Sequence, residues 1–164
     1  MTRCVLVGPP GAGKTTVGRL VAESLGATFR DTDDDVVEAA GKPIADIFFD
    51  EGEAEFRRLE RIAVAAALAG HDGVLALGGG AVIDVDTRVE LLTHTVVHLT
   101  VALHDATKRV GWGPGRPMLD LNPRAKLAEL MVRRRPLYDE VATHTVETTG
   151  RTPDAVAAEV VALL

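Results

Sequence analysis

The sequence predicts a single α/β domain in which helices cover both faces of a five-stranded parallel sheet, in three αβα layers. Short apolar runs alternate along the chain with longer segments whose apolar residues recur at the helical period of 3.6. Strands covered on both faces are expected to be continuous Val- and Leu-rich runs, as these are. The chain has 164 residues, of which 46% are hydrophobic, so it can bury one core but has no room for a second full domain.

Five segments are expected to form the strands, and two of them carry a weaker signal. The strong candidates are residues 4–7, 74–77 and 96–101, and the weaker ones are residues 28–31 and 142–147. Four segments have the periodicity of amphipathic helices and alternate with these strands. The expected helices comprise residues 16–25, 55–68, 125–131 and 155–164.

Residues 111–117 interrupt the alternation of strands and helices. This stretch, Gly-Trp-Gly-Pro-Gly-Arg-Pro, contains three glycines and two prolines, which no regular element accommodates. We therefore expect a long loop, and long loops in small domains are usually functional or disordered.

Residues 8–15 match the phosphate-binding pattern G-x-x-x-x-G-K-[ST] and connect the first expected strand to the first expected helix. The glycines allow backbone N–H groups to surround an anion, and the positive end of the helix points to the same place. Lys14 would reach the β- and γ-phosphates, and the Thr15 hydroxyl would ligate Mg²⁺. The sequence therefore predicts a nucleotide site. The motif alone does not distinguish a kinase from a GTPase, an ATPase or a regulatory switch.

An acidic residue that assists the metal is expected at another strand end, in the string Asp31-Thr32-Asp33. Alternation along the strand would place Asp31 and Asp33 on a common side, one near Mg²⁺ and one near the hydroxyl to be phosphorylated. The alternative is a solvated acidic helix start, because acids favour helix N-termini.

The strand expected at residues 74–77 ends in three consecutive glycines, Gly78, Gly79 and Gly80. Three glycines together indicate either a close approach of backbone to a substrate or another group, or a flexible turn. Backbone N–H groups exposed there could hold a polar substrate.

The composition excludes several classes of partner and site. The chain has 24 acidic residues and 18 Lys and Arg, a net charge of -6, which argues against a general nucleic-acid or anionic-membrane surface. The single cysteine, Cys4, excludes an intrachain disulfide and a multi-cysteine metal site. No 18-residue apolar run or signal segment occurs, so a cytoplasmic protein is expected. The histidines show no metal-ligand spacing and are expected to be ordinary loop or surface residues: His71, His94, His98, His104 and His144.

Several motifs occur in the order and spacing that is typical of one enzyme family, and together they span the chain from end to end. They lie at residues 8–15, 31–33, 44–48, 52–57, 77–80, 116–119 and 134–138. On these motifs the chain resembles the shikimate kinases. The resemblance implies a P-loop kinase with strand order 2-3-1-4-5. It also implies that ATP phosphorylates the 3-hydroxyl of shikimate to give shikimate 3-phosphate and ADP, a step of chorismate and aromatic amino-acid biosynthesis.

The resemblance also implies a role for individual residues. Asp33 would contact the shikimate hydroxyls and either act as the base for the 3-hydroxyl or help to position it, with Lys14 and Arg116 acting on the transferred phosphate. Asp31 would support one Mg²⁺ ion together with Thr15. The shikimate site would comprise Asp33, Phe48, Phe56, Arg57, Glu60, Gly78, Gly79, Gly80 and Arg134, with the two arginines on the carboxylate. The nucleotide site would comprise Gly11, Ala12, Gly13, Lys14, Thr15, Thr16, Arg109, Arg116, Arg151 and Pro153.

Two segments are expected to surround the bound molecules, a shikimate-binding segment at about residues 31–60 and a mobile lid at about residues 111–123. Arg134 belongs to this site, whereas its neighbours Arg133 and Arg135 are expected at a solvated helix end. Guanidinium groups suit a planar carboxylate better than ammonium groups do. A monomer is expected.

The sequence departs from the family pattern at a few positions. It also leaves other functions as alternatives to shikimate phosphorylation. Val37 stands where the family often has Glu, Met118 replaces a frequent Leu, and Trp112 has no family counterpart. The alternatives are another small-molecule kinase, such as a gluconate or nucleoside monophosphate kinase, or a regulatory nucleotide-binding protein without catalysis. The chain lacks both the His-Pro pair of gluconate kinases and the Asn-Lys-x-Asp signature of GTPases.

Overall fold

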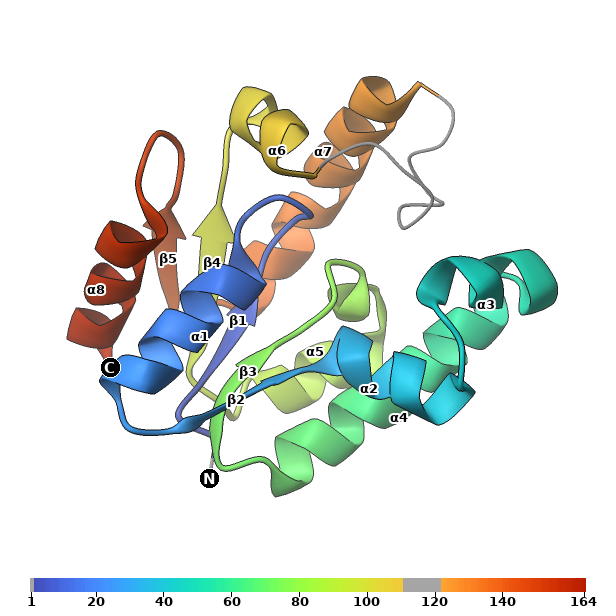
Figure 1. Ribbon diagram of the computed structural model, residues 1–164, viewed down its shortest axis with the longest axis horizontal. Coiled ribbons are helices and arrows are strands. Elements are labelled where there is room, and N and C mark those ends of the chain that lie inside the picture. Colours follow the sequence, from blue (N-terminus) through green and yellow to red (C-terminus); the bar gives the residue numbers. More distant parts are fainter. Residues whose placement is uncertain (1, 111–121) are drawn as a thin grey trace.

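The five expected strands form one parallel sheet with helices on both of its faces (Figure 1). The computed structural model describes residues 2–110 and 122–164. The strand order is β2-β3-β1-β4-β5, which confirms the predicted fold and strand order. The strands comprise β1 Cys4–Val7, β2 Thr28–Asp31, β3 Gly73–Ala76, β4 Val96–Thr100 and β5 His144–Glu147.

Each expected helix is present, although its ends differ from the expected ones. These helices are α1 Lys14–Ser24, α4 Glu53–Gly70, α7 Pro123–Val141 and α8 Pro153–Leu163. The sequence periodicity did not indicate the shorter helical segments. These are α2 Thr32–Ala40, α3 Ile44–Glu51, the 3₁₀ turn η1 Ala81–Ile83, α5 Val85–Leu91 and α6 Leu103–Val110.

Alternate residues of β1 pack against opposite helical layers. Cys4 and Leu6 lie in an apolar cluster with residues of α1 and α8, whereas Val5 and Val7 lie in a second cluster with residues of α4 and α5. Helix α7 contributes to both clusters (Figure 1). Every residue of the inner strands β1, β3 and β4 is buried, while the edge strands β2 and β5 keep exposed positions. Partial exposure explains why the edge strands had the weaker sequence signal.

A third apolar cluster joins the helices at the β2 edge of the sheet. Val36 of α2, Ile47 of α3 and Phe56 of α4 are buried together there, with Phe48 packed against them. In Figure 1, α2 and α3 lie beyond β2, away from the strands. This cluster fixes the expected shikimate-binding segment against the long helix α4.

The expected continuation of β2 through Asp33 is wrong. The strand ends at Asp31, which caps α2: its Oδ1 accepts a hydrogen bond from the Asp33 backbone N–H at 3.0 Å. Asp33 therefore lies in the first turn of a helix, as the alternative reading of an acidic helix start predicted. The cap turns the chain out of the sheet, so strand alternation does not set the direction of the Asp33 side chain.

Two further expectations are also wrong. His98 is a buried residue of β4, 2% exposed, and not a loop or surface residue. Residues 133–135 lie within α7, which continues to Val141 and contains Pro136, rather than at a helix end. Arg133 and Arg135 are exposed on this helix, as expected, whereas Arg134 is buried. None of the helices within residues 2–110 and 122–164 combines the length and apolar character that a membrane crossing requires.

Candidate active site

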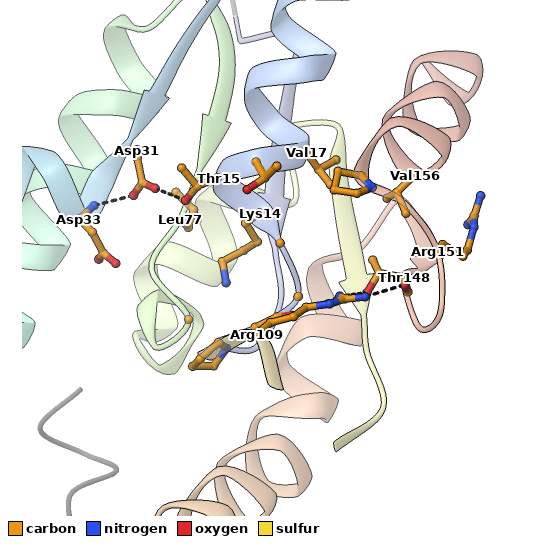
Figure 2. Close-up of a pocket in the computed structure, with 17 residues that line it drawn as sticks. Lys14, Thr15, Val17, Asp31, Asp33, Leu77, Arg109, Thr148, Arg151 and Val156 are labelled. Atoms are coloured by element: carbon orange, nitrogen blue, oxygen red, sulfur yellow. Dashed lines mark hydrogen bonds between the residues drawn. The ribbon is translucent and has the colours of Figure 1, made fainter. Parts of the chain in front are cut away.

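A cavity of about 440 Å³ lies beside the loop that follows β1. Strand β1 lies between β3 and β4, and in open α/β sheets such a reversal of strand order opens a crevice at the carboxyl ends of the strands. In Figure 2, Asp31 and Asp33 lie on one side of Lys14, and Thr148 and Arg151 lie on the other. The lining comprises Pro10, Gly11, Ala12, Gly13, Lys14, Thr15, Thr16, Val17, Asp31, Asp33, Leu77, Gly79, Arg109, Thr148, Arg151, Pro153 and Val156.

The loop at residues 8–15 has the shape of an anion-binding cradle. Gly11 has φ +83°, and a Cβ there would lie 2.7 Å from the backbone oxygen of Ala106, so this position requires glycine. Gly13 precedes α1 with φ +87°, and no side chain caps the helix and no acidic residue lies in its first turn. The first N–H groups of α1 are therefore left for an anion. Lys14 Nζ donates to the backbone oxygens of Gly8 at 2.8 Å and Pro9 at 3.1 Å.

Thr15 and Asp31 provide a pair of oxygen ligands at the edge of the cavity. The Thr15 hydroxyl donates to Asp31 Oδ2 at 2.8 Å, while Asp31 Oδ1 is held by the α2 cap (Figure 2). Neighbouring ligands of an octahedral Mg²⁺ ion are about 2.9 Å apart, so the spacing of this pair fits that ion. Among the described residues, no group of three or more His, Cys, Asp and Glu is arranged to hold a metal. Two protein oxygens suit Mg²⁺, which usually takes its other ligands from phosphates and water.

Arg109 is held in place on the far side of the cavity by backbone and side-chain oxygens. Its Nη1 donates to the Thr148 hydroxyl at 2.9 Å and its Nη2 to the Thr148 backbone oxygen at 2.9 Å (Figure 2). Thr148 is itself buried and donates to the backbone oxygen of Thr100 at 2.8 Å. Arg151 is held by the Glu147 backbone oxygen at 2.8 Å.

The three glycines after β3 allow charged side chains to approach the backbone closely. A Cβ on Gly78 would lie 2.5 Å from Asp33 Oδ1 and 2.9 Å from Glu60 Oε2, and one on Gly80 would lie 2.6 Å from Arg57 Nη2. The sequence predicted either close approach or a flexible turn here, and the structure shows close approach. The groups that approach the glycines belong to the protein itself: they are the carboxylates of Asp33 and Glu60 and the guanidinium of Arg57.

Arg57 lies against Gly80, and Arg134 lies near enough to Arg57 for the two charges to interact. Arg57 Nη1 lies 2.8 Å from Glu60 Oε1, and the Arg57 guanidinium lies 5.1 Å from the centre of the Phe56 ring. The Phe56 and Phe48 ring centres are 4.8 Å apart, so the two rings form one apolar wall. Burial raises the pKa of Glu60 above its ordinary value, against the opposing effect of Arg57.

Arg134 is 5% exposed, and its environment favours a bound anion. Burial lowers the pKa of Arg134, and the like charge of Arg57 lowers it further. Within the described ranges, Nε of both arginines is buried without a hydrogen-bond partner. Buried donors nearly always have a partner in proteins, so these N–H groups are available to a ligand acceptor.

The family model for "Shikimate kinase" matches residues 10–164. A shikimate kinase from Salinispora arenicola is 65% identical over 161 residues, which cover 98% of this chain and 96% of that protein. The chain belongs to the shikimate kinase family. This membership confirms the predicted enzyme class and reaction.

Solved structures separate the shikimate kinase family from its nearest alternative. A shikimate kinase from Acinetobacter baumannii in complex with shikimate has a TM-score of 0.94 and 39% identity, over 98% of this chain and 90% of that one. A gluconokinase from Sinorhizobium meliloti, with a TM-score of 0.58 and 17% identity over 97% and 89% of the two chains, shares the fold alone. The gluconate kinase alternative is therefore not favoured.

The structure places the expected site residues in two neighbouring groups. Every described residue of the expected nucleotide site lines the large cavity, together with Asp31 and the expected substrate residues Asp33 and Gly79. Arg57, Glu60 and Gly80 line a different cavity of about 270 Å³. Residues 111–121, which include Arg116, Trp112 and most of the lid expected at about residues 111–123, lie outside the described residues.

Sequence reasoning missed two side chains that touch this site. Thr148 holds Arg109, and the Tyr138 hydroxyl donates to the backbone oxygen of Gly79 at 2.6 Å. Tyr138 ended a motif that carried the family resemblance, but it had no assigned role. Thr148 carried no signal, because a threonine after an edge strand is common and its partner is 39 residues away.

Proposed function

We propose that this chain transfers the γ-phosphoryl group of ATP to the 3-hydroxyl of shikimate, giving shikimate 3-phosphate and ADP. The observation that carries the proposal is the pair of guanidinium groups of Arg134, which is buried, and Arg57, which is partly exposed and lies against Gly80. Nε of each arginine is buried without a hydrogen-bond partner among the described residues, and two guanidinium groups with such donors are suited to a carboxylate. Shikimate has one carboxylate and the hydroxyl groups that a kinase needs.

In this proposal the nucleotide occupies the large cavity. The N–H groups of the loop and of the first turn of α1 bind the phosphates, and Lys14 reorients from its backbone partners to the γ-phosphate. Arg109 and Arg151 flank the adenine of ATP, on the side where Thr148 and Pro153 line the cavity. Arg116 belongs to the proposed lid at about residues 111–123, which would cover the reaction and exclude water.

Mg²⁺, when bound with ATP, neutralises charge on the β- and γ-phosphates. Thr15 and Asp31 would hold it, since their oxygens have the required type and spacing. Asp31 is held on both sides, by the Thr15 hydroxyl and by the α2 cap, so its carboxylate is already oriented. The protein therefore does not need to reorganise this side of the site for the reaction.

Asp33 is the proposed base. It lies between the large cavity and Gly78, and so between the nucleotide and the proposed carboxylate site. As the 3-hydroxyl oxygen bonds to the γ-phosphorus, the bond to the ADP oxygen breaks and Asp33 accepts the hydroxyl proton. Arg57 and Arg134 grip the carboxylate, with Glu60 orienting Arg57 and the rings of Phe48 and Phe56 forming an apolar wall.

We further propose that the enzyme acts as a cytoplasmic monomer formed by one domain. Size-exclusion chromatography with light scattering tests the oligomeric state, and a mass of two chains would refute the monomer. Nucleic acid and membranes are not proposed as partners, because the net charge is -6.

The proposed reaction is tested by coupled ADP release with ATP and Mg²⁺. Shikimate, gluconate and nucleoside monophosphates are compared at equal concentrations. We expect kcat/KM for shikimate to exceed the others by about 100-fold or more, because the chain belongs to the shikimate kinase family and a site shaped for one substrate binds others less well in the transition state. ADP release with gluconate but not with shikimate would refute the proposal.

A further inference from the structure

Tyr138 joins helix α7 to the glycines that follow β3, through a hydrogen bond between residues 59 positions apart. Its hydroxyl donates to the backbone oxygen of Gly79 at 2.6 Å, and the side chain is 1% exposed. Tyr138 follows Arg134 by four residues, so the two side chains share one face of α7. The Tyr138 phenol and the Arg134 guanidinium also lie close enough for each to affect the pKa of the other.

The ring of Tyr138 is fixed by its packing. It belongs to the apolar cluster on the α4 and α5 face of the sheet, and its centre lies 5.1 Å from the His98 ring. His98 in turn places Nδ1 3.1 Å from Asp139 Oδ1. Burial raises the pKa of Tyr138 to about 12, so the phenol stays protonated and remains a donor at neutral pH.

The bond to Gly79 restrains the middle of a short segment whose two ends meet charged groups of the site. On one side, Gly78 lies against Asp33 and Glu60, and on the other, Gly80 lies against Arg57. A shift of the Gly79 carbonyl would move both neighbours. The Tyr138 hydroxyl therefore bonds the backbone segment against which Asp33, Glu60 and Arg57 pack. It also lies close to Arg134.

We infer that Tyr138 is a positioning residue for the carboxylate substrate, because its hydroxyl holds Gly79 and Arg134 in the arrangement that binds shikimate. This inference rests on the proposed function. A tyrosine that only filled the core would need one hydrogen-bond acceptor for its hydroxyl. The Tyr138 hydroxyl has that acceptor in Gly79 and also interacts with Arg134, a proposed substrate-binding residue. The hydroxyl should therefore affect shikimate binding more than folding or ATP binding.

The substitution Tyr138→Phe removes the hydroxyl and keeps the ring, and it tests the inference by steady-state kinetics. We expect the KM for shikimate to rise about tenfold, because Gly79 and Arg134 lose a buried partner. The KM for ATP should rise less than the KM for shikimate, because Tyr138 bonds no residue of the phosphate-binding loop itself, although Gly79 lines the nucleotide cavity. An unchanged KM for shikimate overturns the inference, as does an equal rise in both KM values.

Asp139→Asn is the matched control. It changes the next residue of α7 and weakens the contact with His98, but it leaves the hydroxyl in place. We expect its KM for shikimate to equal that of the wild type. A rise equal to that of Tyr138→Phe would show that any disturbance of α7 has this effect, and would overturn the specific role of the hydroxyl. If the wild type itself does not phosphorylate shikimate, the proposed function fails. This outcome is distinct from the results of the Tyr138→Phe and Asp139→Asn comparisons, which test the role of the hydroxyl.

A measurement on the unaltered protein does not depend on the folding of a variant. Tyr138 is the only tyrosine, so tyrosine labelled with ¹³C at Cζ gives a single NMR signal. We expect saturating shikimate to shift this signal, because the carboxylate draws Arg134 into a new hydrogen bond. A signal that does not move at saturation, while turnover shows that shikimate binds, overturns the inference.

Discussion

Replacing Gly80 by alanine tests how the protein holds Arg57. Gly80 has φ -97° and ψ 0°, a conformation open to other residues, so the methyl group brings little backbone strain. The added Cβ would lie 2.6 Å from Nη2 and 2.7 Å from Cζ of Arg57, whereas ordinary contacts begin at 3.4 Å. The guanidinium must therefore retreat by roughly 1 Å.

The retreat of Arg57 has a larger effect on binding than on folding. It pulls Nη1 away from Glu60 Oε1, now 2.8 Å distant, and moves the guanidinium from the place where a carboxylate is expected. A hydrogen bond between charged groups contributes about 1.5–3 kcal/mol, so the KM for shikimate should rise about 10- to 100-fold. The guanidinium is the end of a flexible side chain and can swing aside, so the free energy of unfolding should change by less than about 1 kcal/mol.

Gly70→Ala provides a matched control, because it adds a methyl group in open space at the end of α4. Both variants are compared with the wild type by steady-state kinetics, with shikimate and ATP varied in turn, and by thermal unfolding. We expect Gly70→Ala to bind shikimate as the wild type does. If Gly80→Ala also binds shikimate normally, Arg57 does not need its present position, and the reasoning fails.

Further substitutions and a titration examine other parts of the site. Asp33→Asn should lower kcat by about 10²- to 10⁴-fold and leave ATP binding intact in a calorimetric titration; a loss of ATP binding would contradict its role as base. Thr148→Val removes one of the hydrogen bonds that hold Arg109, so the KM for ATP should rise about threefold to tenfold while that for shikimate stays constant. Tyr138 should show no tyrosinate absorbance at pH 10 to 11 in the folded protein, because burial raises its pKa to about 12. Its protonated phenol contributes fully to stability below about pH 10, the ordinary pKa, and this contribution is lost as the pH rises towards 12. A half-ionised Tyr138 at pH 10 in folded protein would refute the burial argument.

The phosphate-binding loop could be predicted from the sequence because its chemistry lies in one continuous string. Residues 8–15 contain both the glycines that shape the loop and the side chains that face the phosphates, and the flanking strand and helix gave strong local signals. The inner strands were equally clear, because burial on both faces leaves an uninterrupted apolar run.

The arginine site could not be predicted from local pattern, because its members come from distant segments. Arg57 lies on α4 and Arg134 on α7, and only the family resemblance singled them out among the other arginines. Asp31 and Asp33 do lie on a common side of the cavity, as expected, but the reason is the Asp31 cap of α2 rather than strand alternation. His98 was misjudged because a polar residue within an apolar run was read by its type rather than by its strand.

The glycine triplet explains how one short segment serves both halves of the proposed reaction. A side chain at Gly78 would collide with the carboxylates of Asp33 and Glu60, and one at Gly80 would collide with Arg57. A Cβ at Gly79 would lie 3.2 Å from Pro10, a residue of the phosphate-binding loop. The absence of side chains therefore lets the proposed base, the proposed carboxylate site and the phosphate-binding loop meet around three consecutive residues. The Tyr138 hydroxyl bonds the backbone oxygen of Gly79, the middle glycine. The segment can therefore lack side chains and still keep a fixed backbone conformation.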